Sequence, residues 1–159
     1  METRNRNAGA RCAALGGLIA LVIAVDQYTK LLGRSLRGVI DLGPLTILYT
    51  ENRGAFLSLG ENLPAGARAW LFNGAVAVGL IALSIYVYRH PDVPLALIVA
   101  GGFGNLIDRL RFDGKVTDFL YLHAGPLHTG VFNVADMAIT AGTVWMVAAW
   151  FTAREPAAR

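Results

Sequence analysis

Long apolar runs, separated by mixed or polar stretches, dominate the chain. Residues 13–32, 69–88, 93–109 and 131–152 form four such runs, with charged residues at or near their ends. A helix of about 20 residues is about 30 Å long, which matches the hydrocarbon core of a bilayer. The pattern therefore predicts an α-helical integral membrane protein with four transmembrane helices over these ranges.

The first apolar run also has features of a cleaved signal peptide, because basic residues precede it. However, no small-residue cleavage site follows, and the run continues into Asp26-Gln27-Tyr28-Thr29-Lys30. We therefore expect this segment to be retained as the first transmembrane helix.

Two mixed segments, 33–66 and 110–130, lie between the predicted helices. The first contains several glycine and proline breakers, with short β-prone pieces at 38–40 and 45–49 between them. Such pieces bounded by turn residues are typical of a small sheet or hairpin. We expect this sheet to lie outside the bilayer, and we expect the second segment to be a loop.

Composition agrees with a membrane protein and excludes several other classes. Of the 159 residues, 55% are hydrophobic and 16% are charged, and the mean hydropathy is +0.48. These values exclude a disordered chain and a coiled coil, and the 14 basic residues are too scattered for a nucleic-acid-binding arm. The single cysteine, Cys12, excludes an internal disulfide and a cysteine metal cluster. We expect one membrane domain over residues 1–159.

The predicted topology follows from the helix count and from the first basic flank. Four helices place both termini on one side of the membrane and segments 33–66 and 110–130 on the other. Basic residues occur on both sides, but the first helix usually decides the orientation, and Arg4, Arg6 and Arg11 precede it. We therefore predict cytoplasmic termini and two outer loops.

Four aspartates fall at one depth in this topology, near the outer interface: Asp26, Asp108, Asp118 and Asp136. A charge at the centre of a membrane helix costs about 2.5–3.5 kcal/mol on insertion scales, and less near the interface. A single acid at that depth needs no function, but several together indicate a site.

Structural roles remain open for three of these acids. Asp26 and Lys30 have the i,i+4 spacing of an ion pair that closes a helix. Asp108 and Arg109 are candidates for a second structural ion-pair node. Asp136 has the position of a first-turn acid that interacts with a helix dipole.

Asp118 and Asp136 are the best candidates for chemistry. Two aspartates in one low-dielectric pocket share a proton, so one is ionised while the other is protonated. The ionised member can take a proton from water while the protonated member donates to a carbonyl, which is peptide hydrolysis without a covalent intermediate. Rival sites are weaker, because G-x-S-x-G is absent and His123 and His128 belong to no H-E-x-x-H motif. We expect neither a metal nor a cofactor.

Five short motifs extend over residues 26–136, and together they resemble the lipoprotein signal peptidase family, also called signal peptidase II. Each motif alone is weak, but five in this order on a chain with four predicted helices are specific. The motifs are Asp26-Gln27-Tyr28-Thr29-Lys30, Asn52-x-Gly54, Gly101-Gly102-x-Gly104-Asn105-x-x-Asp108-Arg109, Val116-Thr117-Asp118-Phe119 and Phe132-Asn133-Val134-Ala135-Asp136.

The resemblance implies a membrane aspartyl endopeptidase of the bacterial cytoplasmic (inner) membrane, with four transmembrane helices and a small extracytoplasmic β-cradle after the first helix. Its substrates would be prolipoproteins with a lipobox signal peptide, cleaved before a cysteine that carries diacylglyceryl. Besides these substrates it would contact membrane lipid but no nucleic acid, and it would be a monomer.

The resemblance also implies a role for each motif residue. Asp118 and Asp136 would be the catalytic pair, while Asp26 and Lys30 would support the fold. The remaining polar and glycine positions would bind the substrate or orient the catalytic pair, and they are Asn52, Gly54, Asn105, Asp108, Arg109 and Asn133.

Two departures from the family pattern leave alternatives open. Asn52-Arg53-Gly54-Ala55-Phe56 is one alanine shorter than the usual motif, and the stretch 125–130 lacks the usual tryptophan and proline pattern. A divergent branch with altered substrate or inhibitor preference is one alternative. A non-catalytic relative that binds lipoproteins is a second, and only the shortened Asn52 motif favours it. A proton-coupled transporter that uses the same acids is another, although transporters usually place charges near the midplane and contain internal repeats.

Overall fold

The computed structural model describes residues 2–52 and 65–153, without the side chains of 2–8 and of most of 65–72. Within these residues, four helices and four strands follow one another. The helices are α1 (Glu2–Ser35), α2 (Ala65–Arg89), α3 (Val93–Arg111) and α4 (Val134–Thr152). The strands are β1 (Ile40–Asp41), β2 (Leu45–Asn52), β3 (Val116–Ala124) and β4 (Leu127–His128).

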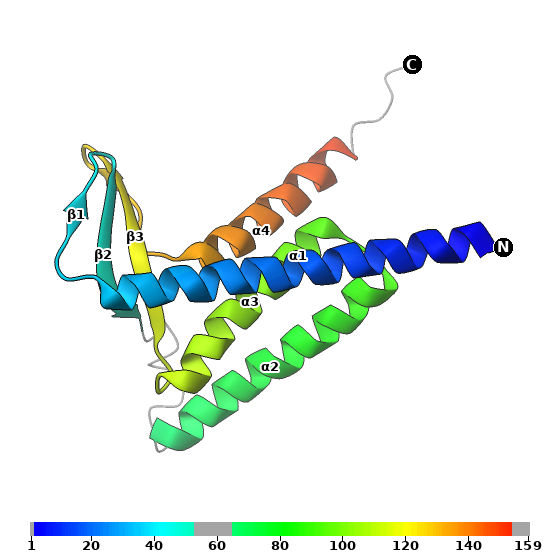
Figure 1. Ribbon diagram of the computed structural model, residues 1–159, viewed down its shortest axis with the longest axis horizontal. Helices are drawn as coiled ribbons and strands as arrows, with labels where there is room; N and C mark the ends of the chain where they lie inside the picture. Colours follow the sequence, from blue (N-terminus) through cyan, green and yellow to red (C-terminus); the bar gives the residue numbers. More distant parts are fainter. Residues whose placement is uncertain (1, 53–64, 154–159) are drawn as a thin grey trace.

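The helices form a bundle with the sheet at one end (Figure 1). The beginning of α1 and the end of α4 lie at the opposite end, together with the turn between α2 and α3 (Figure 1). Helix α3 is central, since it packs against α1, α2 and α4. A small apolar core of Leu15, Val87, Ala96 and Val99 joins α1, α2 and α3.

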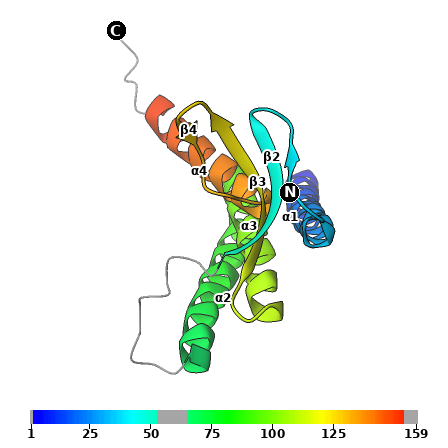
Figure 2. The same cartoon turned by 90° about the vertical axis from the view of Figure 1, so that its left-hand side faces the viewer.

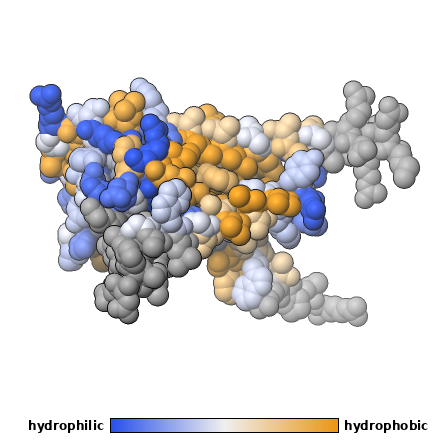
Figure 3. All heavy atoms as spheres, turned by 90° about the horizontal axis from the view of Figure 1, so that it is seen from below, coloured by the Kyte–Doolittle hydropathy of each residue, from blue (hydrophilic) through white to orange (hydrophobic). Residues whose placement is uncertain are grey.

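Three of the described helices are long and apolar enough to cross a membrane: Gly9–Ser35, Val93–Arg111 and Val134–Thr152. The apolar part of α2 in the described residues, Asn73–Arg89, is shorter. Large apolar side chains remain exposed along the helices, including Leu21, Val78 and Val144. Viewed from below, an apolar surface extends along the helices, while hydrophilic residues gather at the sheet end (Figure 3).

The predicted helix boundaries were approximate. Helix α1 begins at Glu2, well before residue 13, so the polar N-terminal segment continues the helix. Helix α4 begins at Val134 rather than at residue 131, because Phe132 forms a bridge with Leu120 and Asn133 caps the helix.

The sheet is antiparallel with the strand order β1-β2-β3-β4. Figure 2 shows it from the sheet end, with the helices behind it. The β-prone pieces predicted in the first loop are confirmed as β1 and β2. The prediction that 110–130 is only a loop was wrong, since β3 and β4 lie there and β3 pairs with β2. The sheet is therefore built from both segments.

Glycines in α3 permit a very close approach of the neighbouring helices. A Cβ on Gly101 would collide with the backbone oxygen of Ala135 in α4. A Cβ on Gly104 would lie 2.6 Å from Oδ2 of Asp26 in α1. These glycines therefore serve close helix packing, and the packing brings polar groups of α1, α3 and α4 together.

Candidate active site

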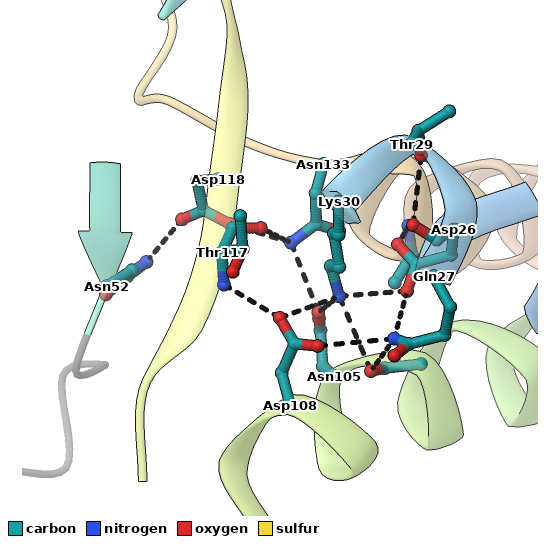
Figure 4. A network of polar contacts seen from close by, with 12 residues as sticks. Asp26, Gln27, Thr29, Lys30, Asn52, Asn105, Asp108, Thr117, Asp118 and Asn133 are labelled. Atoms are coloured by element: carbon teal, nitrogen blue, oxygen red, sulfur yellow. Dashed lines mark hydrogen bonds and ion pairs between the residues drawn. The ribbon is translucent and has the colours of Figure 1, made fainter. Parts of the chain in front are cut away.

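The candidate site lies where the sheet meets the ends of α1 and α3 and the start of α4 (Figures 1 and 4). The carbonyl of Phe132 accepts hydrogen bonds from Phe119 N and Leu120 N at 3.0 and 2.9 Å. This pairing places the next residue, Asn133, beside Asp118 on β3. The chain order alone does not reveal the contact, because 15 residues separate the two positions.

Asp118 lies on β3, opposite Thr50 of β2, and is only 1% exposed. Its two carboxylate oxygens each accept a hydrogen bond from an asparagine amide. Asn133 Nδ2 donates to Oδ1 at 2.7 Å, and Asn52 Nδ2 donates to Oδ2 at 3.0 Å (Figure 4). The structure thus brings together three of the predicted site residues.

Burial raises the pKa of the Asp118 carboxyl above its usual value. The amide hydrogen bonds from Asn52 and Asn133 lower this pKa, the negative charge of Asp136 raises it, and the charge of Lys30 lowers it. Because burial outweighs the hydrogen bonds, Asp118 holds its proton more readily than an exposed aspartate.

Asp136 lies in the first turn of α4 and is partly buried. It forms a capping box with Asn133, since Asn133 N donates to Asp136 Oδ2 at 3.2 Å and Asp136 N donates to Asn133 Oδ1 at 3.0 Å. The structural role considered for this acid is therefore real. Asp136 also has a partner outside its helix, because Asn105 Nδ2 donates to its Oδ1 at 2.8 Å.

Asn105 and Asn133 join the two acids in one network. Asn133 Nδ2 also donates to Asn105 Oδ1 at 3.2 Å, so the two amides contact each other between α3 and α4. Asp118 and Asp136 each accept from one of these amides. Both acids predicted to be catalytic therefore belong to a single cluster drawn from different elements.

A buried ion-pair cluster lies beside this network (Figure 4). The predicted pair of Asp26 and Lys30 is confirmed at 2.9 Å, with the side chains 1% and 0% exposed. Lys30 also lies 3.7 Å from Asp108, and Asp26 Oδ1 accepts from Ala135 N at 2.8 Å. The pair thus connects α1 to α3 and α4, rather than only closing its own helix.

The second predicted ion-pair node exists with different partners. Asp108 pairs with Lys30 and, at 2.9 Å, with Arg34, and it accepts from Thr117 N at 2.9 Å. Within the described residues, Arg109 takes no part in these ion pairs. Its side chain is partly buried, and its charge interacts with those of Asp136, Asp118 and Asp108.

Sequence reasoning assigned no role to two contributors to the cluster, Gln27 and Arg34. Gln27 Nε2 donates to Asp26, to the Gly104 carbonyl and to Asp108 at 3.1–3.3 Å. Arg34 Nε donates to Thr117 Oγ1 at 2.8 Å, and its guanidinium lies 3.9 Å from the ring centroid of Phe112. Helical spacing offered a signal for Arg34, because it lies four residues after Lys30 on the same face.

One predicted site residue, Gly54, and the two histidines of the weaker rival site lie outside this cluster or outside the described residues. Gly54, and with it the shortened motif after Asn52, lies outside the described residues. His123 and His128 face each other across β3 and β4, and His123 Nε2 contacts Thr46 Oγ1 at 3.1 Å. Among the described residues, no group of three or more His, Cys, Asp or Glu side chains could hold a metal ion.

The family model for Signal peptidase (SPase) II matches residues 18–152 of this chain. The chain belongs to the signal peptidase II family. This is a family of aspartic peptidases, and its members remove signal peptides from prolipoproteins. The predicted resemblance is therefore confirmed.

Proteins named lipoprotein signal peptidase are similar to the chain over most of its length. The one from Syntrophus aciditrophicus is 39% identical and the alignment covers 80% of this chain and 85% of the relative. The one from Francisella tularensis is 37% identical, with 83% and 88% covered. The one from Burkholderia mallei is 35% identical, with 92% of each covered.

Two solved structures described as bacterial membrane enzymes have the same fold. Each superposes with a TM-score of 0.72, at 24% and 25% sequence identity. The first covers 92% of this chain and 94% of its own, and the second covers 87% and 92%. The mainly helical membrane fold with a small sheet is thus shared with known membrane enzymes.

Proposed function

We propose that this signal peptidase II family member hydrolyses diacylglyceryl-modified prolipoproteins before the lipidated cysteine, with Asp118 and Asp136 as its catalytic pair. One observation carries this assignment. Carboxylates from β3 and from α4 meet in a single network of amide donors, at the end of the bundle where the sheet lies. The family's aspartic chemistry requires two such groups at one place.

The proposed reaction uses the two acids in different protonation states. The ionised member takes a proton from a water molecule, and the resulting hydroxide attacks the scissile carbonyl carbon. The protonated member donates to the carbonyl oxygen. When the tetrahedral intermediate collapses, the C–N bond breaks and the proton taken from water passes to the leaving amine. The proton on the former carbonyl oxygen returns to the second acid as the C=O bond re-forms, so the pair regains its starting state.

The neighbouring residues orient the pair in this proposal. Asn52, Asn105 and Asn133 supply the amide donors that the two carboxylates accept. Arg109 and Gly54 are assigned to substrate binding, and Asp108 fixes the start of β3 through Thr117.

We propose a membrane topology in which α2 is the fourth span of a single membrane domain. The start of α1, the α2–α3 turn and the end of α4 share one end of the bundle, which supports placing both termini on one side of the membrane (Figure 1). The basic residues before the apolar part of α1 favour the cytoplasm for that side. The sheet and the site then lie at the outer face of the cytoplasmic membrane. Prolipoprotein and lipid contact a monomer, and no nucleic acid is bound.

Cleavage by the purified wild-type protein tests the function. A prolipoprotein is supplied in detergent with and without its diacylglyceryl group, and the product masses are measured. We expect only the modified substrate to be cut, with the lipidated cysteine as the new N-terminal residue. A protein that binds this substrate without cutting it would be the non-catalytic relative. A different cleavage position would also contradict the proposal.

A further inference from the structure

Lys30 makes a contact that charge balance does not require. Its ammonium is completely buried and lies 2.9 Å from Asp26 and 3.7 Å from Asp108, which already supply negative charge. It nevertheless donates to the amide oxygen of Asn105 at 2.9 Å, a distance equal to that of its closer ion pair. Figure 4 shows this contact reaching from α1 into the amide network.

The chemistry of this contact determines how the Asn105 amide is oriented. An asparagine amide can exchange its oxygen and nitrogen by a half-turn, but an ammonium group has only donors. Lys30, at 2.9 Å, is the nearer of the two donors to the amide oxygen of Asn105, so this oxygen faces Lys30. The amide nitrogen must then face the other way, and there it donates to Asp136 Oδ1 at 2.8 Å.

We propose that Lys30 is a positioning residue for the hydrolysis, which acts through Asn105 to keep an N–H donor directed at the Asp136 carboxylate. This inference rests on the proposed catalytic role of Asp136 and extends it to a residue assigned above only to fold support. Asn133 Nδ2 also donates to the Asn105 oxygen, but at the longer distance of 3.2 Å. Without Lys30, this weaker contact alone opposes a half-turn of the Asn105 amide that would present its oxygen to Asp136. The Asp136 carboxylate then loses the N–H donor of Asn105, and an amide oxygen, which is itself an acceptor, faces it instead.

The test separates this role from charge balance by a matched pair of variants. Asp26→Asn removes one charge of the buried ion pair but keeps the Lys30–Asn105 contact. Asp26→Asn combined with Lys30→Met removes both charges, so no unpaired cation or anion is added relative to the wild type. Both are purified, and kcat and KM are measured per folded molecule on the diacylglyceryl-modified substrate.

We expect Asp26→Asn to accumulate less but to keep kcat within about threefold of the wild type. The double variant loses roughly 100-fold in kcat relative to Asp26→Asn, since small misplacements of catalytic groups have effects of this size. Its KM changes little, because Lys30 does not line the substrate site in this proposal. Equal kcat in the two variants would overturn the inference. So would failure of the double variant to accumulate where Asp26→Asn accumulates.

A double-mutant cycle tests whether Lys30 acts through Asn105. Adding Asn105→Ala to the charge-matched double variant should cost less than about threefold further in kcat, because the contact that Lys30 fixes is already lost. A further loss in kcat of roughly 100-fold on adding Asn105→Ala would show that Lys30 and Asn105 act independently, and it would reject the inference. Wild-type cleavage, and its loss in Asp118→Asn, are measured in the same assay. If those fail, the proposed function is wrong, whereas failure of the cycle alone rejects only the role of Lys30.

Discussion

At the scale of single residues, Asn133 performs two tasks with one side chain. Its Oδ1 accepts from Asp136 N and caps α4, while its Nδ2 donates to Asp118. The sequence motif includes Asn133, but none of the three partners of its Nδ2 is near in sequence. They are Asp118, the Thr117 carbonyl and Asn105, which lie 15, 16 and 28 residues away. Such long-range polar contacts cannot be predicted from local pattern.

Asn133→Ser separates the two tasks. Serine is a good N-cap, but its side chain is too short to replace the donor to Asp118. We expect kcat to fall by roughly 100- to 1000-fold, as when one preorganised donor to a reacting group is removed. Thermal unfolding should show a smaller loss of stability for Asn133→Ser than for Asn133→Ala, since the alanine also removes a cap contributing about 1 kcal/mol. Equal stability losses would argue against the cap.

The raised pKa of Asp118 predicts how its removal changes stability with pH. A carboxyl whose folded-state pKa lies above its unfolded value, about 3.9, stabilises the fold most below that unfolded value. This stabilisation is lost as the pH rises through the folded-state pKa. Asp118→Asn lacks the titration, so at neutral pH its Tm should equal or exceed that of the wild type. The difference should decrease toward pH 4 in a series of melting curves, and a variant that is much less stable at neutral pH would contradict this.

At the scale of elements, the helices were easier to predict than the strands. Apolar runs of about 20 residues give a strong signal for membrane helices. The sequence signal for strand β3 was weak. Its first four residues, 116–119, are all buried, so the sequence there does not alternate between polar and apolar positions. Its pairing with β2 joins segments more than 60 residues apart, so it was missed.

Gly101→Ala tests the close approach of α3 and α4. The added Cβ would collide with the backbone of Ala135, which cannot move without shifting the start of α4. We expect accumulation in the membrane and cleavage both to fall. Gly79→Ala in α2 is the matched control, because nothing lies within 4 Å of its added Cβ and alanine favours a helix by about 1 kcal/mol. Equal behaviour of the two variants would show that this packing is unimportant.

At the scale of the whole molecule, the four aspartates lie together at one end of the bundle, as their predicted depth in the membrane suggested. The sequence placed Asp26, Asp108, Asp118 and Asp136 at one level, and the structure gathers them at the sheet end of the bundle. A transporter would be expected to place such acids near the midplane. The one-sided placement instead fits an enzyme that receives its substrate at a membrane surface.

Reporter fusions test the proposed topology. A reporter inserted after Gly60 or near Gly125 should be active only outside the cytoplasm, and one fused after Arg159 only inside. The start of α1 and the end of α4 lie together, away from the sheet, so the two reporters should differ (Figure 1). The basic residues before the first apolar run assign the termini to the inside. The opposite pattern would place the acids on the cytoplasmic side and would reject the mechanism.

Cleavage of a diacylglyceryl-modified prolipoprotein by purified Asp118→Asn and Asp136→Asn, beside the wild type, tests the central claim most directly. Asparagine keeps the shape of each side chain and removes its titration. We expect each variant to insert and accumulate yet to lose cleavage, and we expect the double variant to be little worse than either, because members of a catalytic unit are not additive. Near-normal turnover by either single variant would contradict the assignment of the catalytic pair.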